Sequence, residues 1–233
     1  MSYTKNDKVV LKLGGHLLSN ATGNFNIEYL KKLTPIIEYL KKSVKKLIIV
    51  VGGGQIARQY INTAYFFSRN NSSLDLLGIK VSHLNALLLS IITNNPPTSI
   101  PENLQDVINQ ISYRNIIITG GFQPGQSTTT VSALIAEAIS ADLLIIATDV
   151  DGIYEKDPKK YPHAKLLTET TIDILKKIFD KSIIEAGEYK LLDPYTLKIL
   201  ERSKIKTIII NGKNPENIIK AIKGEKIGTL IKT

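Results

Sequence analysis

The chain has 233 residues, of which 43% are hydrophobic and 22% are charged. This balance is typical of a folded globular protein and excludes a disordered, collagen-like or low-complexity chain. No apolar run reaches the roughly 18 residues that a membrane helix requires, and the polar residues 1–7 are not followed by the apolar core of a signal peptide. Cysteine is absent, which excludes disulfides, thiolate metal sites and a thiol nucleophile. We therefore expect a cytoplasmic protein that makes no membrane contact.

Lysine and arginine outnumber aspartate and glutamate by 30 to 21, which gives a formal net charge of +9. Such an excess favours an anionic partner, which is a nucleic acid, a phosphorylated metabolite or a membrane surface. Many of the lysines lie in amphipathic helical stretches, where solvated charges are ordinary. No basic run is interleaved with aromatic residues, tryptophan is absent, and no helix–turn–helix or zinc-finger spacing occurs. We predict that nucleic acid is not a partner.

Short apolar runs rich in β-branched residues recur along the chain and alternate with helical patterns. The runs are continuous rather than alternating, as in strands of a parallel sheet that is covered on both faces. We expect strands over residues 9–13, 47–51, 115–119, 143–148 and 207–210.

Helical periodicity fills the segments between these strands. We expect helices over residues 27–42, 55–68, 76–93, 128–140, 171–179, 195–203 and 215–223, and loops over 94–97 and 181–190. A kink or restart of the first helix at Pro35 stays open. The alternation predicts an α/β protein, a three-layer α/β/α sandwich with a mainly parallel central sheet. We expect a single domain over residues 1–233, and a division into two lobes stays open.

Glycine clusters follow three of the predicted strands, at Gly14-Gly15, at Gly52-Gly53-Gly54, and at Gly120-Gly121 with Gly125. Ligands of open α/β sheets bind at the carboxyl ends of the strands, where such loops converge. Glycine lets backbone amides approach an anion closely, and a helix that begins just beyond adds its free N–H groups. Three clusters in this position predict a phosphate-type ligand.

Several common motifs are absent. The phosphate-binding Gly-x-x-x-x-Gly-Lys-[Ser/Thr] loop does not occur, and the triple glycine has the wrong spacing for a dinucleotide site. No Gly-x-Ser-x-Gly elbow exists, and His16, His83 and His163 are too scattered for a metal set or a triad. These absences argue against a P-loop NTPase, a dinucleotide dehydrogenase, a hydrolase and a metalloenzyme.

Two basic residues stand beside the glycine clusters. Lys12 lies inside the first predicted strand, where a charge is costly unless a phosphate at the strand end pairs with it; the alternative is a lysine that reaches solvent at a sheet edge. Arg58 falls one turn into the helix after the triple glycine, where it can reach a phosphate or simply face solvent. The polar loops 120–130 and 148–158 supply hydroxyls, carboxylates and a tyrosine ring beside the same predicted edge.

The motifs at residues 12–15, 51–58 and 148–154 together resemble those of the amino-acid kinase superfamily. Within it the chain is most similar to the archaeal type of uridylate (UMP) kinase, on residues 74–79, 84–86, 120–127, 191–194 and 199–203. The resemblance runs from about residue 8 to the C-terminus. It implies the three-layer fold, transfer of the γ-phosphoryl group of ATP to UMP, Mg²⁺ with ATP, and a hexameric homo-oligomer.

The resemblance also implies roles for single residues, with an acceptor half over about 1–140 and an ATP half over about 141–233. The implied ATP-binding residues are Lys12, Leu13, Gly14, Gly15, His16, Gly54, Arg58, Thr148, Asp149, Tyr154 and Asp157. The implied UMP-binding residues are Gly53, Asp75, Phe122, Gln123, Pro124, Gly125, Gln126, Ser127 and Thr128. Lys12 and Arg58 are the implied catalytic residues. Mg²⁺ is expected to be held through the nucleotide phosphates rather than by protein ligands.

Four residues, His16, His83, Thr129 and Asp149, depart from the usual pattern of the family. Two alternatives stay open beside UMP kinase. One is another kinase of the same fold, although no histidine stands between Gly52 and Ser82 to favour an isopentenyl phosphate kinase, and Asp75 alone is thin support for an amino-acid kinase. The other is a nucleotide- or oxyanion-binding protein without turnover.

Overall fold

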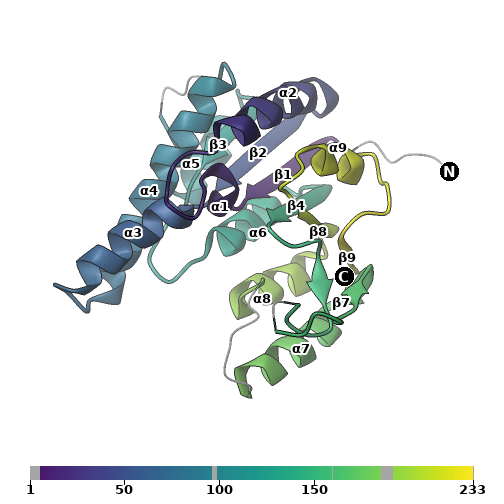
Figure 1. The fold of residues 1–233 in the computed structure, drawn as a ribbon. Coiled ribbons are helices and arrows are strands. Elements are labelled where there is room, and N and C mark those ends of the chain that lie inside the picture. Colours follow the sequence, from purple (N-terminus) through teal and green to yellow (C-terminus); the bar gives the residue numbers. More distant parts are fainter. Residues whose placement is uncertain (1–5, 96–98, 159, 185–190, 233) are drawn as a thin grey trace.

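The computed structural model describes residues 6–95, 99–158, 160–184 and 191–232. Its centre is a seven-stranded sheet in the order β3-β2-β1-β4-β8-β9-β7 (Figure 1). The strands are β1 Lys8–Leu13, β2 Lys46–Val51, β3 Ile116–Thr119, β4 Leu143–Thr148, β7 Glu169–Thr171, β8 Thr207–Asn211 and β9 Thr229–Lys232. β1 to β4 and β8 run parallel, whereas β9 is antiparallel to β8 and carries β7 at the edge. The prediction of a mainly parallel sheet is confirmed.

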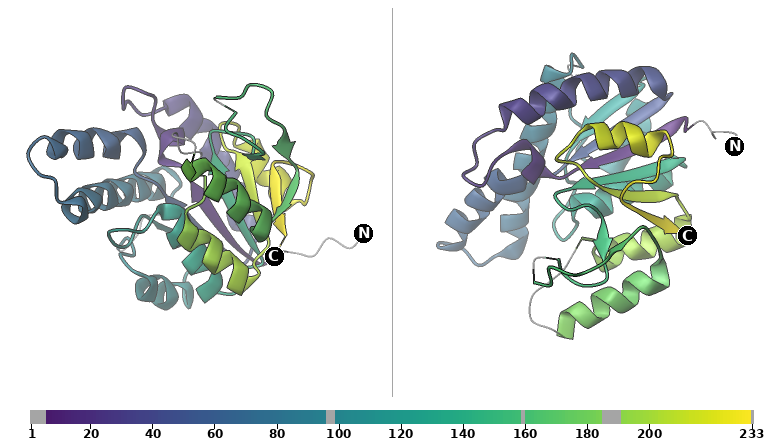
Figure 2. Two further views of the ribbon diagram at one scale, coloured as in Figure 1. Left: turned by 90° about the horizontal axis from the view of Figure 1, so that it is seen from below. Right: turned by 45° about the vertical axis from the view of Figure 1, so that its right-hand side comes forward.

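Helices cover both faces of the sheet. They are α1 Gly15–Leu18, α2 Ile27–Ser43, α3 Gly54–Tyr65, α4 Asn71–Ile92, α5 Leu104–Ile111, α6 Thr128–Ala138, α7 Ile172–Ile184, α8 Pro194–Ser203 and α9 Glu216–Ile222. In Figure 2, α2 and α9 lie on one side of the sheet, and α7 and α8 on the other. α3 and α4 pack together as a hairpin that projects from the body of the protein (Figure 1).

Two hydrophobic cores, one on each face of the sheet, explain why the strand sequences are continuously apolar. Leu11 and Leu13 of β1 join α2, α9 and part of α4 in one core, whereas Val10 joins α6 and α8 in the other. Successive side chains of a strand point to opposite faces, so most positions of the central strands need an apolar residue. The expected three-layer sandwich is thereby confirmed. The same alternation places Lys12 on the α6 side of the sheet.

Several elements differ from the sequence-based expectation. α4 begins at Asn71 rather than at residue 76, because Asn70 caps it and accepts from the Ser73 amide at 3.0 Å. α2 runs through Pro35 without ending there. α1, α5, β7, β9 and the short antiparallel pair β5 Ile153–Tyr154 and β6 Leu166–Leu167 were not predicted. All of these are short, so they carry little periodic signal.

The two predicted loops have different outcomes. α7 continues to Ile184, so the expected loop at 181–190 is wrong over its first residues, and 185–190 lie outside the described residues. Asn94 and Asn95 follow the end of α4 as expected, and residues 96–97 lie outside the described residues.

Part of the positive charge supports the fold directly. The ammonium groups of Lys8, Lys41 and Lys46 donate to carbonyl oxygens at the C-terminal ends of α6, α4 and α5, the acceptors being Ile139, Thr93 and Ile111. A cation at this end of a helix also interacts favourably with the helix dipole. These three lysines therefore have a structural role apart from any ligand.

Of the helices in the described part of the chain, α4 alone is long and apolar enough to cross a membrane, with a mean hydropathy of 1.5 over its best window. This finding agrees with the sequence, which has no uninterrupted apolar run of membrane-spanning length, because Asp75 and Lys80 interrupt the apolar residues of α4. In the fold 44% of that window is buried, and Ala86 and Leu89 belong to a core.

Candidate active site

The first two glycine clusters meet at the carboxyl ends of β1 and β2. A Cβ atom at Gly15 would lie 2.3 Å from the Gly52 carbonyl oxygen and from the Gly54 nitrogen. Gly54 has a φ of 65°, and a Cβ there would lie 2.4 Å from the carbonyl carbon of Gly15. Only glycine permits this approach, which brings the turn before α1 against the turn before α3.

The third glycine cluster is attached to α4. The Gly121 amide donates to Ser82 Oγ at 2.8 Å, and the Gly125 amide donates to Asp75 Oδ2 at 2.8 Å. His83 Nε2 lies 2.7 Å from the Gly121 carbonyl oxygen. Because a carbonyl only accepts, this ring nitrogen carries the proton. α4 therefore fixes both ends of the loop that follows β3.

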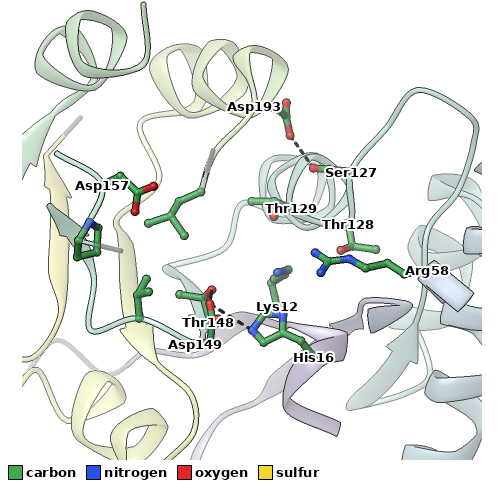
Figure 3. A pocket seen from close by; sticks show the side chains of 13 residues that line it. Lys12, His16, Arg58, Ser127, Thr128, Thr129, Thr148, Asp149, Asp157 and Asp193 are labelled. Carbon is green, nitrogen blue, oxygen red and sulfur yellow. Dashed lines mark hydrogen bonds and ion pairs between the residues drawn. The ribbon is translucent and has the colours of Figure 1, made fainter. Parts of the chain in front are cut away.

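A large cavity of about 590 Å³ opens between these turns and β4 (Figure 3). Lys12, His16 and Arg58 lie on one side of it, and the first turn of α6 faces them. Its lining residues are Lys12, His16, Arg58, Ser127, Thr128, Thr129, Thr148, Asp149, Val150, Asp157, Pro158, Leu191 and Asp193.

A smaller cavity of about 190 Å³ lies between α3, α4 and the loop after β3. Thr128 lines both cavities, so the two adjoin at the N-terminus of α6. The residues that line the smaller one are Gly53, Gly54, Ala57, Ile61, Asp75, Gly78, Ile79, Ser82, Gly121, Gln123, Gln126 and Thr128. Two adjoining cavities provide space for two ligands that meet end to end.

Two basic side chains that line the large cavity, Lys12 and His16, have lowered pKa values. Burial lowers the pKa of Lys12 to about 8, although the charge of Asp149 opposes this shift. Burial and then the charge of Lys12 lower the pKa of His16 to about 4, and the Asp149 carboxylate, 3.7 Å from His16 Nε2, offsets this only in part. His16 is therefore neutral near pH 7. A phosphate in this space would favour the charged form of Lys12.

Two helix N-termini are joined at the rim of the large cavity. Ser127 caps α6 by accepting from the Thr130 amide at 3.0 Å, and its hydroxyl donates to Asp193 at 2.5 Å. Asp193 caps α8 by accepting from the Thr196 amide at 2.9 Å. Each cap accepts from the amide of the third residue of its helix. The first two amides of α6, at Thr128 and Thr129, have no acceptor among the described residues and can bind an anion.

Comparison with known proteins identifies the family. A model of the amino acid kinase family matches residues 7–211. The uridylate kinase of Sulfurisphaera tokodaii is 46% identical over 226 residues, which cover 96% of this chain and 98% of that protein. The chain belongs to the amino acid kinase family, among its uridylate kinases. The uridylate kinase of Archaeoglobus fulgidus, a solved structure, has a TM-score of 0.85 at 37% identity and covers 96% of this chain and 99% of its own.

A solved structure with lower sequence identity has a similar fold. The UMP kinase of Bacillus anthracis is 20% identical and has a TM-score of 0.81, covering 97% of this chain and 96% of its own. The two proteins therefore share the arrangement of sheet and helices although their sequences have diverged widely.

The cavities contain more than half of the site residues that the sequence suggests. Lys12, His16, Gly53, Gly54, Arg58, Asp75, Gln123, Gln126, Ser127, Thr128, Thr148, Asp149 and Asp157 line one cavity or the other. The others do not line either cavity; they are Leu13, Gly14, Gly15, Phe122, Pro124, Gly125 and Tyr154.

Several of the predicted site residues make contacts that support the fold. Leu13 is fully buried in a core, and Phe122 packs against the other core. The Tyr154 hydroxyl donates to Asp151 at 3.2 Å. The hydroxyl of Ser127 is engaged in the α6 cap and in its bond to Asp193.

Other lining residues were not among the sequence-based candidates. Asp193 is the clearest, and its position before Pro194 is a typical N-cap signal that could have drawn attention to it. Ile79 and Ser82 of α4 had no such signal, because the sequence of an apolar helix does not reveal which face lies beside a loop 40 residues away.

Proposed function

We propose that the protein transfers the γ-phosphoryl group of ATP to UMP, giving ADP and UDP, as a step of pyrimidine nucleotide synthesis. The observation that carries this proposal is the junction of two cavities at Thr128, beside Lys12 and Arg58. Membership of the uridylate kinases supports the choice of both substrates.

The larger cavity is proposed to bind ATP. Lys12 and Arg58 would contact its phosphates, while Thr148, Asp149 and Asp157 lie toward the space for the adenosine. The smaller cavity is proposed to bind UMP, with Asp75 accepting from ribose hydroxyls. Every residue that lines the smaller cavity lies between 53 and 128, whereas residues beyond 141 line only the larger one. This division supports an acceptor half and an ATP half within one domain.

Catalysis would consist of alignment and charge neutralisation. An oxygen of the UMP phosphate forms the new bond to the γ-phosphorus as the bond to the β-phosphate oxygen breaks, and ADP leaves with the electron pair. The attacking oxygen is already an anion, so no general base is required. Lys12, with the amides at the N-termini of α3 and α6, would stabilise the transferring group. Neutral His16 would add no charge of its own.

Mg²⁺ is proposed to enter with ATP. Among the described residues no group of three histidine, cysteine, aspartate or glutamate side chains could hold a metal ion. Mg²⁺ commonly binds through one or two carboxylates together with substrate phosphates and water. The ion is expected to be held through the nucleotide phosphates, and Asp149, which lines the same cavity, would lie near them. The ion would neutralise charge on the phosphates.

A cytoplasmic homo-oligomer is proposed as the working form, with the hexamer as its expected size. The outward face of α4 exposes large apolar side chains, at Leu76, Leu84, Leu87 and Ile91, in the described part of the chain. Exposed apolar faces of this kind are typical of protein interfaces. A second copy of the chain is the proposed occupant. Both substrates are cytoplasmic metabolites.

The test is an assay of ADP release with ATP and Mg²⁺, in which UMP, CMP, dUMP and isopentenyl phosphate are offered separately as acceptors. UMP is expected to give the highest kcat/KM, and the Lys12→Ala variant to lose about 100-fold or more in kcat while it still binds UMP. A preference for isopentenyl phosphate would contradict the proposal. ADP release with none of the acceptors would favour a binding protein.

A further inference from the structure

Asn85, in the middle of α4, contacts the main chain of the triple-glycine turn. Its side-chain amide donates to the Gly52 carbonyl oxygen at 2.9 Å and lies 3.3 Å from the Gly53 carbonyl oxygen. The residue is only 2% exposed. In the described part of the chain Asn85 lines neither cavity, whereas Gly53 and Gly54 line the smaller one. Any effect of Asn85 on a ligand must therefore pass through the turn.

Peptide geometry determines what this contact does. The Gly52 carbonyl and the Gly53 N–H belong to one planar trans peptide, so they point in opposite directions. The same holds for the Gly53 carbonyl and the Gly54 N–H. Because one side chain holds both carbonyls, both N–H groups are turned away from Asn85. Among the described residues neither N–H has a hydrogen-bond acceptor, as expected at the start of α3.

The choice of asparagine is informative. Asparagine is unfavourable inside a helix, because its side chain competes for backbone hydrogen bonds. At this position its NH₂ group offers two donors, which match two carbonyls. A leucine would fit a helix better, but it would leave the buried Gly52 carbonyl without this donor and the Gly53 carbonyl with the Ala57 amide at 3.3 Å. An aspartate would place a carboxylate oxygen against two carbonyl oxygens.

We propose that Asn85 is a positioning residue for phosphoryl transfer. It holds the Gly53 and Gly54 amides in the orientation that receives a phosphate where the two cavities adjoin. The inference rests on the proposed function, since it assigns these amides to the phosphate of the acceptor nucleotide. Through Asn85, the helix α4 would position the amides that bind the acceptor phosphate. The same helix also binds the loop after β3 through Ser82 and Asp75.

The first experiment compares Asn85→Asp and Asn85→Ala with the wild-type protein. Steady-state rates are measured while UMP and ATP are varied separately. We expect kcat to fall about 100-fold in Asn85→Asp, because the amides lose their alignment. Ser90→Ala is the matched control. Ser90 is also buried on α4, and its hydroxyl has no hydrogen-bond partner among the described residues. The kcat of Ser90→Ala is expected to stay within about twofold of the wild type.

Thermal unfolding curves establish that each variant is folded at the assay temperature. A folded Asn85→Ala protein with wild-type kcat and KM would overturn the inference, even if its melting temperature had fallen. No turnover of UMP by the wild type would instead contradict the proposed function. The two failures are therefore distinguishable.

A second experiment needs no folded Asn85→Asp protein. In the wild type, the amide resonances of Gly53 and Gly54 are followed by NMR during titration with UMP, and separately with uridine. We expect the amide protons to shift with UMP but not with uridine, because only UMP carries a phosphate. Equal shifts with both ligands, or none with UMP at saturation, would overturn the inference.

Discussion

The hydroxyl of Ser127 donates to Asp193 at 2.5 Å, although the two residues are 66 positions apart in the chain. Each is the N-cap of a helix, Ser127 for α6 and Asp193 for α8. Thr130, one turn into α6, donates to the same carboxylate at 2.8 Å. One carboxylate therefore caps its own helix and fixes the start of another, at the rim of the proposed ATP cavity.

Replacing Asp193 should destabilise the fold more than the loss of an ordinary cap. Asp193→Ala removes the acceptor for Ser127, Thr130 and Thr196, so we expect the free energy of unfolding to fall by about 2 kcal/mol. Asn70→Ala, which removes an exposed cap of α4 with a single amide donor, should cost about 1 kcal/mol or less. Urea denaturation measures both values, and equal losses would contradict this account.

The contribution of Asp193 should also depend on pH. Burial alone would raise the pKa of its carboxyl, but the hydrogen bonds from Ser127, Thr196 and Thr130 outweigh burial and hold the pKa below its usual value. The stabilisation is therefore present above the unfolded-state pKa of about 3.9 and is lost as the pH falls below it. The stability difference between the wild type and Asp193→Asn should shrink over that acidic range. Urea midpoints at several pH values test this.

The contact between the turns before α1 and α3 should tolerate no side chain. Gly54→Ala combines a positive φ with a Cβ 2.4 Å from the Gly15 main chain, so we expect kcat to fall at least about 100-fold. Gly224→Ala is the control, because Gly224 also has a positive φ, of 76°, but faces open space. It should lose about 1 kcal/mol of stability and keep its kinetics. Equal kcat values for Gly54→Ala and Gly224→Ala would show that the close contact between the two turns is not needed for activity.

The ionisation of Lys12 should govern the alkaline side of the pH profile. Its pKa of about 8 in the free protein means that its charge is lost as the pH rises through that value. We therefore expect kcat/KM for ATP to decline above about pH 8, since this constant reports the free enzyme. In Lys12→Arg the decline should disappear, because arginine stays protonated. An unchanged alkaline limb in that variant would assign the ionisation to another group.

Asp75 should affect the acceptor rather than ATP. It lines the smaller cavity and holds the Gly125 amide. We expect Asp75→Asn to raise KM for UMP about 10-fold or more and to leave KM for ATP nearly unchanged. The ratio of kcat/KM for UMP to kcat/KM for dUMP should also become smaller. Asp173→Asn, on the exposed first turn of α7, is the control and should leave all these constants as they are. An effect of Asp75→Asn confined to KM for ATP would place the acceptor elsewhere.

The exposed face of α4 should hold copies of the chain together. Leu84 and Ile91 are 63% and 57% exposed in the single chain. We expect the double variant Leu84→Glu, Ile91→Glu to have a lower mass by light scattering than the wild type, because two charges would have to be buried. Ile174→Glu, at an exposed apolar residue of α7, should keep the wild-type mass. A wild-type protein that is monomeric would contradict the proposed oligomer.

The sequence by itself determined the layered α/β architecture. Residues 143–147 of β4 are all apolar, because both faces of the sheet are buried, and this property is visible without coordinates. It also placed glycine after β1, β2 and β3, and Lys12 inside β1. These features are local, since each depends on residues within one strand and the turn that follows it.

Only the tertiary structure decided which distant residues meet. The pairing of β9 with the edge strand β7, the hydrogen bond from Ser127 to Asp193 and the hydrogen bond from Asn85 to Gly52 all join segments that are far apart in the chain. α4 illustrates the reason: it is apolar almost all round, so its sequence does not distinguish the face that holds the glycine turns from the exposed one. That distinction arises only when the helix packs against the loops after β2 and β3.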